Sequence, residues 1–332
     1  MLREKNAAME KPADAQRIAA SFRKLRDELD RYVVGHENLK EAMILALIAR
    51  EHIYVEGPPG IAKTMLAELI ATAANLNFYF YQFHRDTRLA ELVGDVVIQR
   101  ERGTDNSELI VQSIRKGGVL TAEICVLDDI SRSPGEALNV LLRILNERQY
   151  VQDTIPLLSA IATSNPTVDD YYNEPLDPAN LDRFAIQLRS DGLIQENHWE
   201  QVRQVIDLYA AQQFSDEIKP RAVLNRDIFD EAYDTLHTVS VPEAVKRMLI
   251  DLLERFVNQY KLDSTNSLIT DRAFLVKGVK VLKAMALKDG RLTVEPKDLH
   301  GLGFMTTYRV PEDIHRNITG LINESIRRIG EG

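Results

Sequence analysis

The stretch "VEGPPGIAKTMLAE", from Val55 to Glu68, joins the apolar run "HIYVE" to a pattern typical of a helix. Its centre, "GPPGIAKT", matches G-x-x-x-x-G-K-[ST], in which a loop between a strand and a helix holds phosphate groups. Glycines in such a loop let backbone N–H groups approach phosphate oxygens without an intervening Cβ atom. The residues expected to contact a bound nucleotide here are Gly57, Pro58, Pro59, Gly60, Ile61, Ala62, Lys63, Thr64 and Met65.

Lys63 and Thr64 end this loop and begin the helix. We expect the ammonium of Lys63 between the β- and γ-phosphates and the hydroxyl of Thr64 on Mg²⁺. The helix N-terminus adds a partial positive charge that favours anions. A plain Gly/Pro turn followed by an exposed lysine is the alternative, but the strand before the loop and the helix after it argue against that. The sequence therefore predicts a site for a nucleoside triphosphate with Mg²⁺.

An adjacent pair of carboxylates ends a second apolar run, "ICVLDDI". Buried strands rarely end in two carboxylates without a cation or a hydrogen-bond partner. We expect Asp128 to hold Mg²⁺, usually through water, and Asp129 to polarise the attacking water. The alternative is that the pair caps the next helix, and its position downstream of a phosphate loop favours the catalytic interpretation.

Two further polar residues complete the expected site. Asn165 ends the run "IATSNP", where its amide can order water beside the γ-phosphate; an Asn-Pro turn is the alternative. Arg183, in "LDPANLDRFAIQL", precedes another apolar run. Arginine stabilises charge on a transferring phosphoryl group, often from a neighbouring subunit. A surface salt bridge with Asp182 is the alternative role for Arg183.

Strand and helix patterns alternate between His52 and Leu188. The runs "HIYVE", "NFYFYQF", "EICVLDD", "LLSAIATSN" and "FAIQL" have the short length and the β-branched or aromatic residues of strands buried on both faces. This alternation predicts an α/β fold with five parallel strands. After about Asp191, apolar residues recur at three and four spacing, which predicts helices. We expect an N-terminal helical segment over 1–31, an α/β domain over 32–191 and an all-helical domain over 192–332.

Composition sets limits on the class of protein. The chain has 332 residues, 45% of them hydrophobic and 27% charged, as ordinary globular proteins have. A net charge of −9 argues against nucleic-acid binding as the default, although it does not exclude a local basic groove. The single cysteine, Cys125, gives no disulfide framework, and no apolar run is long enough for a membrane span. With no secretory signal at the N-terminus, we expect a cytoplasmic protein.

Together these segments resemble a MoxR-type AAA+ ATPase over roughly Tyr32 to Leu299. "VVGHENLKEAMILALIAREHIYVEGPPGIAKT" resembles the opening block of that family, "CVLDD" its Walker B strand, "ATSNP" its sensor 1 segment and "LDRF" its arginine-finger segment. "ITDRAFLVKGVKVLKAMALKDGRLTVEPKDL" resembles its sensor 2 helix, and "LLRILNERQY" resembles the RavA branch. The resemblance implies a P-loop AAA+ domain, with a five-stranded parallel sheet in the order 5-1-4-3-2, followed by a helical lid domain.

The resemblance also implies roles for residues that the patterns alone leave open. Val34, Gly35 and His36 would lie near the adenine, and Arg272 would be the sensor 2 arginine, acting on its own subunit's nucleotide or across the interface. Arg183 would act on the nucleotide of the next subunit in a ring, for which the family expectation is a homo-hexamer. "GDVVIQRERGTDNSELIVQSIRKGG" and "ERQYVQDTIPLLSAI" would form hairpins that face the pore or a docked partner.

The resemblance implies an ATPase that binds ATP and Mg²⁺ and remodels a client complex, or helps its maturation by cofactor insertion, with a von Willebrand factor A domain protein as partner. One position departs from the family: Asp129 stands where a glutamate is usual. The shorter side chain changes the reach to the attacking water and leaves the rate of hydrolysis open. A nucleotide-dependent assembly scaffold with little hydrolysis is therefore an alternative. A DNA-directed AAA+ motor is a third, which the acidic balance disfavours.

Overall fold

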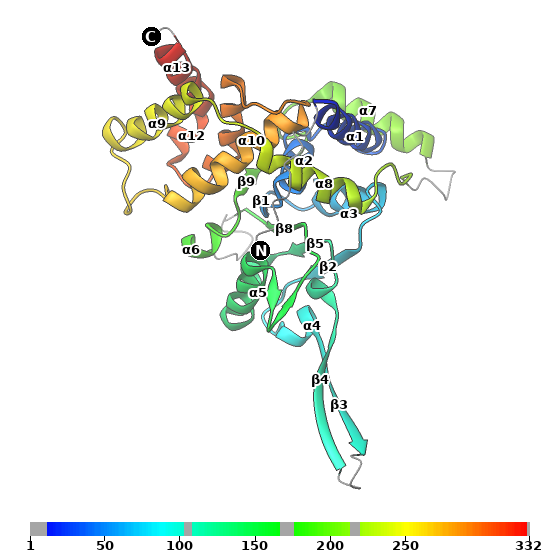
Figure 1. Cartoon of the computed structure of the whole chain (residues 1–332). Helices are drawn as coiled ribbons and strands as arrows, with labels where there is room; N and C mark the ends of the chain where they lie inside the picture. The colour runs from blue at the N-terminus through cyan, green and yellow to red at the C-terminus, as the bar shows by residue number, and fades with distance from the viewer. Residues whose placement is uncertain (1–11, 103–107, 167–175, 213–219, 331–332) are drawn as a thin grey trace.

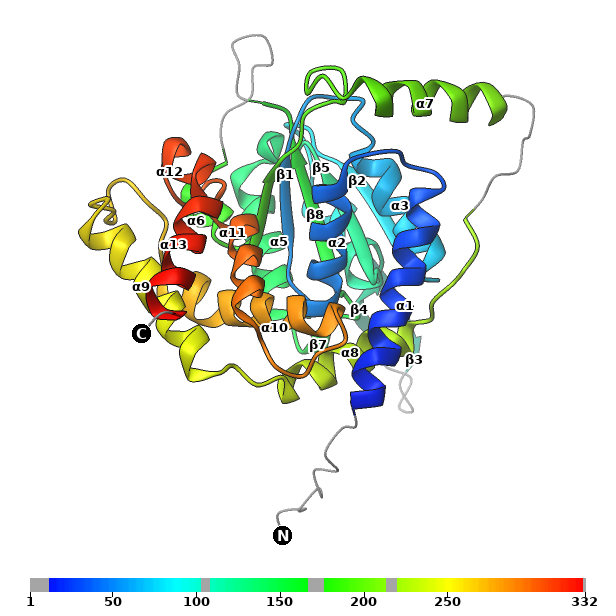
Figure 2. The same cartoon turned by 90° about the horizontal axis from the view of Figure 1, so that it is seen from above.

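A computed structural model of the chain describes residues 12–102, 108–166, 176–212 and 220–330. Its centre is a five-stranded parallel sheet with helices on both faces (Figures 1 and 2). The strands are β1 (Ile53–Glu56), β2 (Phe78–Gln82), β5 (Ile124–Asp128), β8 (Ser159–Ser164) and β9 (Ile186–Arg189). Each strand overlaps one of the five apolar runs, so the α/β class and the five parallel strands are as predicted.

Neighbouring strands follow the order β2-β5-β8-β1-β9, and all four pairs are parallel. These label numbers differ from the expected 5-1-4-3-2 because they also count two hairpins outside this sheet. When only the five strands of the sheet are counted along the chain, the order read from β9 is 5-1-4-3-2. Strands β1 and β5 lie on either side of β8, and all three run parallel. Their carboxyl ends therefore lie together at the same end of the strands, which is where ligands bind in such sheets.

Side chains of the central strands alternate between two hydrophobic cores. In β1, Ile53 and Val55 enter the first core, whereas Tyr54 between them enters the second. Burial on both faces explains why such strands have continuous apolar sequences. The expectation of burial on both faces is wrong for β2, which lies at the edge of the sheet and leaves Phe80 42% exposed.

Two groups of helices cover the two faces of the sheet (Figure 2). The first core includes residues of α1 (Pro12–Asp30), α2 (Glu37–Ala49) and α3 (Lys63–Ala73). The second core includes residues of α4 (Leu89–Val93), α5 (Gly135–Glu147) and the short turns η1 (Gly118–Leu120) and η2 (Ile130–Arg132). A further short helix, α6 (Pro178–Leu181), precedes β9.

Two antiparallel hairpins are separate from the sheet, as the sequence predicts. β3 (Gly94–Arg102) pairs with β4 (Glu108–Lys116) in a long hairpin that projects away from the body of the molecule (Figure 1). β6 (Gln149–Tyr150) pairs with β7 (Asp153–Thr154) just before β8. Residues 103–107, between β3 and β4, lie outside the described residues.

The regular secondary structure described after β9 consists of helices joined by turns and loops, apart from one isolated bridge between Ser240 and Thr293. The ring of Phe229 in this region meets the ring of Phe22 in α1 edge to face, with centroids 5.6 Å apart. One core therefore extends from the N-terminal helices into the C-terminal ones. None of the helices in the described ranges is long and apolar enough to cross a membrane. The elements are α7 (Trp199–Gln212), α8 (Arg226–Thr238), α9 (Glu243–Asn258), η4 (Arg272–Lys277), α10 (Gly278–Lys288), η5 (Pro296–Leu302), α11 (Gly303–Thr306), α12 (Glu312–Arg316) and α13 (Ile318–Gly330).

Candidate functional site

The phosphate loop leaves the carboxyl end of β1 and ends at the first turn of α3, which begins at Lys63. A Cβ atom on Gly57 would lie 2.2 Å from the carbonyl oxygen of Ser190, so the start of the loop is packed against the backbone that follows β9. Gly60 has a φ of +85° in open space, so its backbone conformation alone favours glycine. The two glycines are thus required for different reasons, one for close packing and one for the turn.

Lys63 is only 8% exposed, and its ammonium lies over the loop. Its Nζ atom donates hydrogen bonds to the carbonyl oxygens of Gly57 (2.6 Å) and Pro58 (3.0 Å). Burial lowers the pKa of this ammonium, while the charges of Asp128 and Asp129 act in the opposite direction. The structure therefore brings the lysine of the loop into the electrostatic range of the acidic pair. A cation at a helix N-terminus is a favourable place for a phosphate.

The acidic pair lies at the carboxyl end of β5, beside β8. Asp128 is the last residue of β5, and it accepts a hydrogen bond from the hydroxyl of Thr163 in β8. Asp129 follows with a φ of +54° and is 6% exposed. Its Oδ1 atom accepts a hydrogen bond of 3.0 Å from the side-chain amide of Asn165. The expected grouping of Lys63 with these three polar residues is present in the structure.

Two side chains that the sequence analysis does not single out also contact Asp129. A guanidinium nitrogen of Arg132 lies 3.3 Å from Oδ2, and the amide of Gln82 lies 3.5 Å from the same atom. Gln82 ends β2 and is the register partner of Asp128. The sequence could have pointed to Gln82 because it is a polar residue at the end of an apolar run. It could have pointed to Arg132 because a residue three positions after Asp129 can reach the carboxylate.

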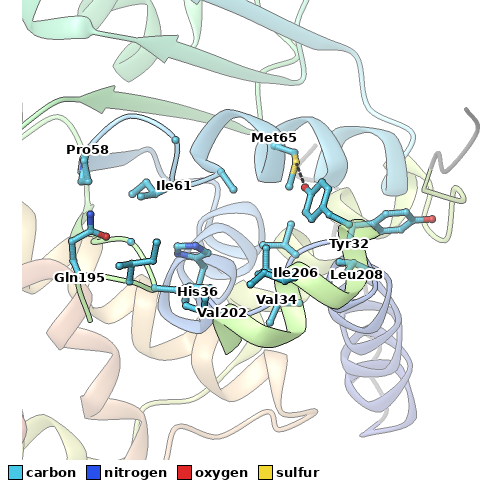
Figure 3. Close-up of a pocket in the computed structure, with 18 of the residues that line it drawn as sticks. Tyr32, Val34, His36, Pro58, Ile61, Met65, Gln195, Val202, Ile206 and Leu208 are labelled. Atoms are coloured by element: carbon cyan, nitrogen blue, oxygen red, sulfur yellow. Dashed lines mark hydrogen bonds between the residues drawn. The ribbon is translucent and has the colours of Figure 1, made fainter. Parts of the chain in front are cut away.

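A cavity of about 540 Å³ opens beside the phosphate loop. Three segments form its walls: the chain before α2, the loop with the start of α3, and the chain from Gly192 into α7 (Figure 3). The hydroxyl of Tyr209 in α7 lies 3.6 Å from the sulfur of Met65 in α3 and spans two of these walls. The lining is mostly apolar, with Val34, Pro58, Pro59, Ile61, Ala62, Met65, Leu193, Ile194, Val202, Val205, Ile206 and Leu208 among its residues. Such walls beside a phosphate-binding loop fit the apolar faces of a purine ring.

Val34 and His36, which the sequence analysis expects near the adenine, line the same cavity as the phosphate loop. The imidazole of His36 lies among the cavity residues (Figure 3), and burial lowers its pKa, with the charge of Lys40 acting in the same direction. Gly35 has a φ of +72°, and a Cβ atom there would lie 2.6 Å from the side-chain oxygen of Gln201 in α7. Glycine therefore permits the close approach of this segment to α7.

Neither of the two arginines singled out from the sequence is among the residues that line this cavity. Arg183 lies between α6 and β9, is half-buried, and has a guanidinium without a hydrogen-bond or ion-pair partner among the described residues. Arg272 is exposed at the start of η4, whose last residue, Lys277, donates to the carbonyl oxygen of Arg183 (3.0 Å). The structure thus brings η4, which begins at Arg272, into contact with the backbone of Arg183, and neither arginine lines the cavity.

Thr64 and Asp128 fit the requirements of Mg²⁺. A hydroxyl and a carboxylate are hard oxygen donors of the kind that this ion prefers, together with phosphate oxygens and water. Thr64 lies in the first turn of α3, beside the buried Lys63. The hydrogen bond from Thr163 fixes the orientation of the Asp128 carboxylate at the same edge of the sheet.

A family model described as the MoxR domain in the MoxR-vWA-beta-propeller ternary systems matches residues 20–223. The chain belongs to the MoxR family of AAA+ ATPases. The matched range holds the phosphate loop, the acidic pair, Asn165 and Arg183. The matched range ends at residue 223, so the match does not include Arg272.

Relatives of this MoxR protein include a chaperone, MoxR1 of Mycobacterium tuberculosis, which is 29% identical over 53% of this chain and 47% of its own length. An uncharacterized protein of Methanocaldococcus jannaschii is 28% identical over 85% of this chain and 69% of its own. The solved structure of an inferred ATPase from Cytophaga hutchinsonii superposes with a TM-score of 0.73 at 21% identity, covering 95% of this chain and 96% of that one. That likeness shows the shared fold.

Proposed function

We propose that this MoxR protein binds ATP with Mg²⁺, hydrolyses it at the interfaces of a homo-oligomeric ring, and uses the cycle to remodel a client protein complex. The observation that carries the proposal is the grouping of Lys63, Asp128, Asp129 and Asn165 at the edge of the sheet where the phosphate loop begins. The cavity beside that loop supplies an apolar place for the base of the nucleotide. A binding titration with ATP and Mg²⁺ and a steady-state turnover assay test the two parts of the proposal.

Each residue would have one task in this site. Lys63 and the backbone N–H groups of the loop would bind the β- and γ-phosphates, and Thr64 with Asp128 would hold Mg²⁺. When bound, the ion would supply positive charge that offsets the charge of the phosphates. Asp129 would accept the proton of the attacking water, and Asn165 would orient that water and the Asp129 carboxylate together.

An assembly scaffold with little hydrolysis remains a second candidate, and a specific contact set favours it. The carboxylate of Asp129 is shorter than the glutamate usual in the family, and it is already in contact with Asn165, Arg132 and Gln82. These contacts hold the short carboxylate in place and restrict its reach toward an attacking water. Turnover near the background level with intact ATP binding would select this candidate.

Arg183 would act on the nucleotide of the adjacent subunit, which makes a ring the active form. Three observations support this role: Arg183 does not line its own cavity, its guanidinium has no partner among the described residues, and it is only half-buried. Arginine supplied by a neighbour stabilises the charge of phosphoryl transfer. Arg272, close to the same segment, would act across the interface with it. A hexamer is the oligomer we propose.

The partner we propose is a protein with a von Willebrand factor A domain. The description of the matched family names MoxR-vWA-beta-propeller ternary systems, and MoxR1 is named a chaperone. We propose that the β3–β4 hairpin faces the pore or a docked partner, because it projects from the body of the molecule (Figure 1). A pull-down from native extract with ATP and the Asp129→Asn variant tests for the partner and the client. The proposal predicts capture of a von Willebrand factor A domain protein that the Lys63→Ala variant does not retain.

A further inference from the structure

Two buried cations from the C-terminal region, Lys277 at the end of η4 and Arg309 in the turn after α11, bind four consecutive carbonyl groups around Arg183. The acceptors are the backbone oxygens of Asp182, Arg183, Phe184 and Ala185. Lys277 donates to the first two at 3.3 and 3.0 Å, and Arg309 donates to the last two at 2.8 and 3.0 Å. The backbone between α6 and β9 is therefore held at every residue from 182 to 185, which we call the Arg183 segment.

Both cations are removed from solvent. Arg309 has no exposed surface, and Lys277 is 6% exposed. Burial lowers the pKa of Lys277 to about 8, opposed first by Glu51, and that of Arg309 to about 10, opposed first by Asp182. Replacing buried charges by apolar side chains of similar volume is often neutral or stabilising. Filling the core is therefore a weak explanation for two cations directed at one short segment.

The Arg183 segment is held by its backbone and not by its arginine side chain. The guanidinium of Arg183 has no hydrogen-bond or ion-pair partner among the described residues, while its carbonyl oxygen accepts from Lys277. Fixing the main chain on either side of a residue limits the positions that its side chain can reach. The arrangement suits a guanidinium that must meet a ligand outside its own subunit.

We propose that Lys277 and Arg309 are positioning residues that direct Arg183 toward the nucleotide of the adjacent subunit; this inference rests on the proposed action of Arg183 across the interface. Lys277 is the last residue of η4, and Arg272 is the first. A shift of η4 would therefore move the Arg272 backbone and the Arg183 segment together. The C-terminal helices thereby set the geometry of an active site in another subunit.

Lys277→Met removes the donor at nearly constant volume, and Lys280→Met is the matched control. Nζ of Lys280 lies 2.8 Å from Oε1 of Glu51, the carboxylate that also faces Lys277 at 3.9 Å. Lys280 has no hydrogen bond to the Arg183 segment among the described residues. Loss of a charge beside Glu51 is thus common to both variants, and loss of contact with the Arg183 segment is confined to Lys277→Met.

The test combines turnover, ATP affinity and mixed rings. We expect Lys277→Met to lower turnover about 10-fold or more at unchanged ATP affinity, because misplacement of a catalytic group by about 1 Å can cost up to about 10²-fold. Lys280→Met should keep wild-type turnover. Lys277→Met subunits mixed with Lys63→Ala subunits should regain activity, since one supplies an intact nucleotide site and the other a well-placed Arg183. Mixed with Arg183→Ala subunits, they should not. Native mass spectrometry with two tags confirms subunit exchange first.

The outcomes separate this inference from the proposed function. Wild-type turnover in Arg183→Ala would overturn the action across the interface and this inference with it. Loss of turnover in Arg183→Ala together with full turnover in Lys277→Met would overturn the inference alone. Rescue of Lys277→Met by Arg183→Ala subunits would also overturn it, because the defect would then lie in its own nucleotide site. If Lys277→Met fails to fold, Lys277→Gln replaces it, because its amide can still donate hydrogen bonds to carbonyl oxygens. The inference then requires that Lys277→Gln retain more turnover than Arg183→Ala, and equal turnover would overturn it.

Discussion

The side-chain amide of Asn165 donates a hydrogen bond of 3.0 Å to the carboxylate of Asp129. Asn165 follows β8 and Asp129 follows β5, and the two strands are neighbours in the sheet. The other carboxylate oxygen faces Arg132 at 3.3 Å, so Asp129 is held from both sides. A base that must meet one water molecule benefits from such a fixed orientation. Whether this fixed position suits the attacking water is measured by the rate of hydrolysis.

Lys63→Ala should abolish tight ATP binding. The ammonium over the phosphate loop would be lost, and a charge-assisted contact to phosphate contributes on the order of 2 to 3 kcal/mol. Equilibrium titration with ATP and Mg²⁺ measures the effect. Thermal unfolding of the variant without nucleotide is the control, since the loop carbonyls of Gly57 and Pro58 also lose their donor. Wild-type affinity in a folded variant would contradict the assignment of the phosphate loop.

Asp129→Asn should retain ATP binding and lower turnover about 10²-fold or more, because the amide cannot accept the proton of water. Asp128→Asn should weaken Mg²⁺-dependent binding as well, since its carboxylate serves the ion. Steady-state phosphate release and nucleotide titration are the measurements. Unchanged hydrolysis in both variants would mean that neither carboxylate acts as proposed.

Asp129→Glu is expected to raise turnover. The added methylene restores the reach of the residue usual in the family, and a change of about 1 Å in the position of a base can alter the rate about 10²-fold. Single-turnover rates at saturating ATP separate the chemical step from binding. Equal rates for the two side chains would indicate that the backbone at Asp129, with its φ of +54°, already compensates for the shorter side chain.

Arg183→Ala should bind ATP normally and be nearly inactive, because an arginine at this step can contribute about 10³ to 10⁵ in rate. Arg328→Ala is the matched control, since Arg328 is an exposed arginine of α13 that forms an ion pair with Asp251. Turnover is measured at protein concentrations where native mass spectrometry shows the assembled ring. A mixture with Lys63→Ala subunits should regain activity, and a failure to do so despite subunit exchange would argue against action across the interface.

Stability should fall in acid partly because of His52. The backbone N–H of Ala160 donates to its Nδ1 atom (3.0 Å), and its Nε2 atom lies 2.9 Å from the carbonyl oxygen of Leu145. Burial, and next the charge of Arg148, hold the pKa of His52 well below 6.5 in the folded state. The unfolded chain therefore binds the proton first as pH falls below 6.5. One such group contributes a loss of up to about 1.4 kcal/mol per pH unit until the folded-state pKa is reached.

His52→Asn isolates this contribution. The asparagine oxygen can still accept the hydrogen bond from Ala160, but the side chain does not titrate. Denaturant unfolding between pH 7 and pH 5 should show a shallower decline of stability for the variant than for the wild type. Parallel curves would show that other groups, such as His36, cause the acid sensitivity.

Much of the fold could be predicted because its signals are local. Residues 57–64 contain the phosphate-loop motif, its turn glycine and the start of the helix within one short stretch. The central strands are buried on both faces and therefore have continuous apolar sequences, which a local reading of the sequence detects. Which strand lies at an edge is a long-range property, and no local pattern in β2 distinguishes it from a central strand. For that reason the exposure of Phe80 could not be read from the sequence.

The positions of Asp129 and Asn165 in the site could be predicted because each residue directly follows a strand, and those two strands are parallel neighbours in the sheet. The position of Arg272 depends on how η4 packs against the rest of the chain, and helical periodicity says which side of a helix is apolar but not what covers it. The contacts of Lys277 with the Arg183 segment likewise join residues 94 and 95 positions apart in the chain, which no motif spacing encodes.

The first hydrophobic core includes Ile18 and Val55 as well as Leu252 and Leu321. A cut between β9 and α7 would divide that core and leave apolar surface on both pieces exposed to water. We therefore expect the nucleotide-binding part of the chain, expressed without the C-terminal helices, to be less stable than the same residues in the full chain. Gene fusions that add a reporter or a partner domain should accordingly keep Ile18 to Leu321 continuous and attach the addition at a terminus.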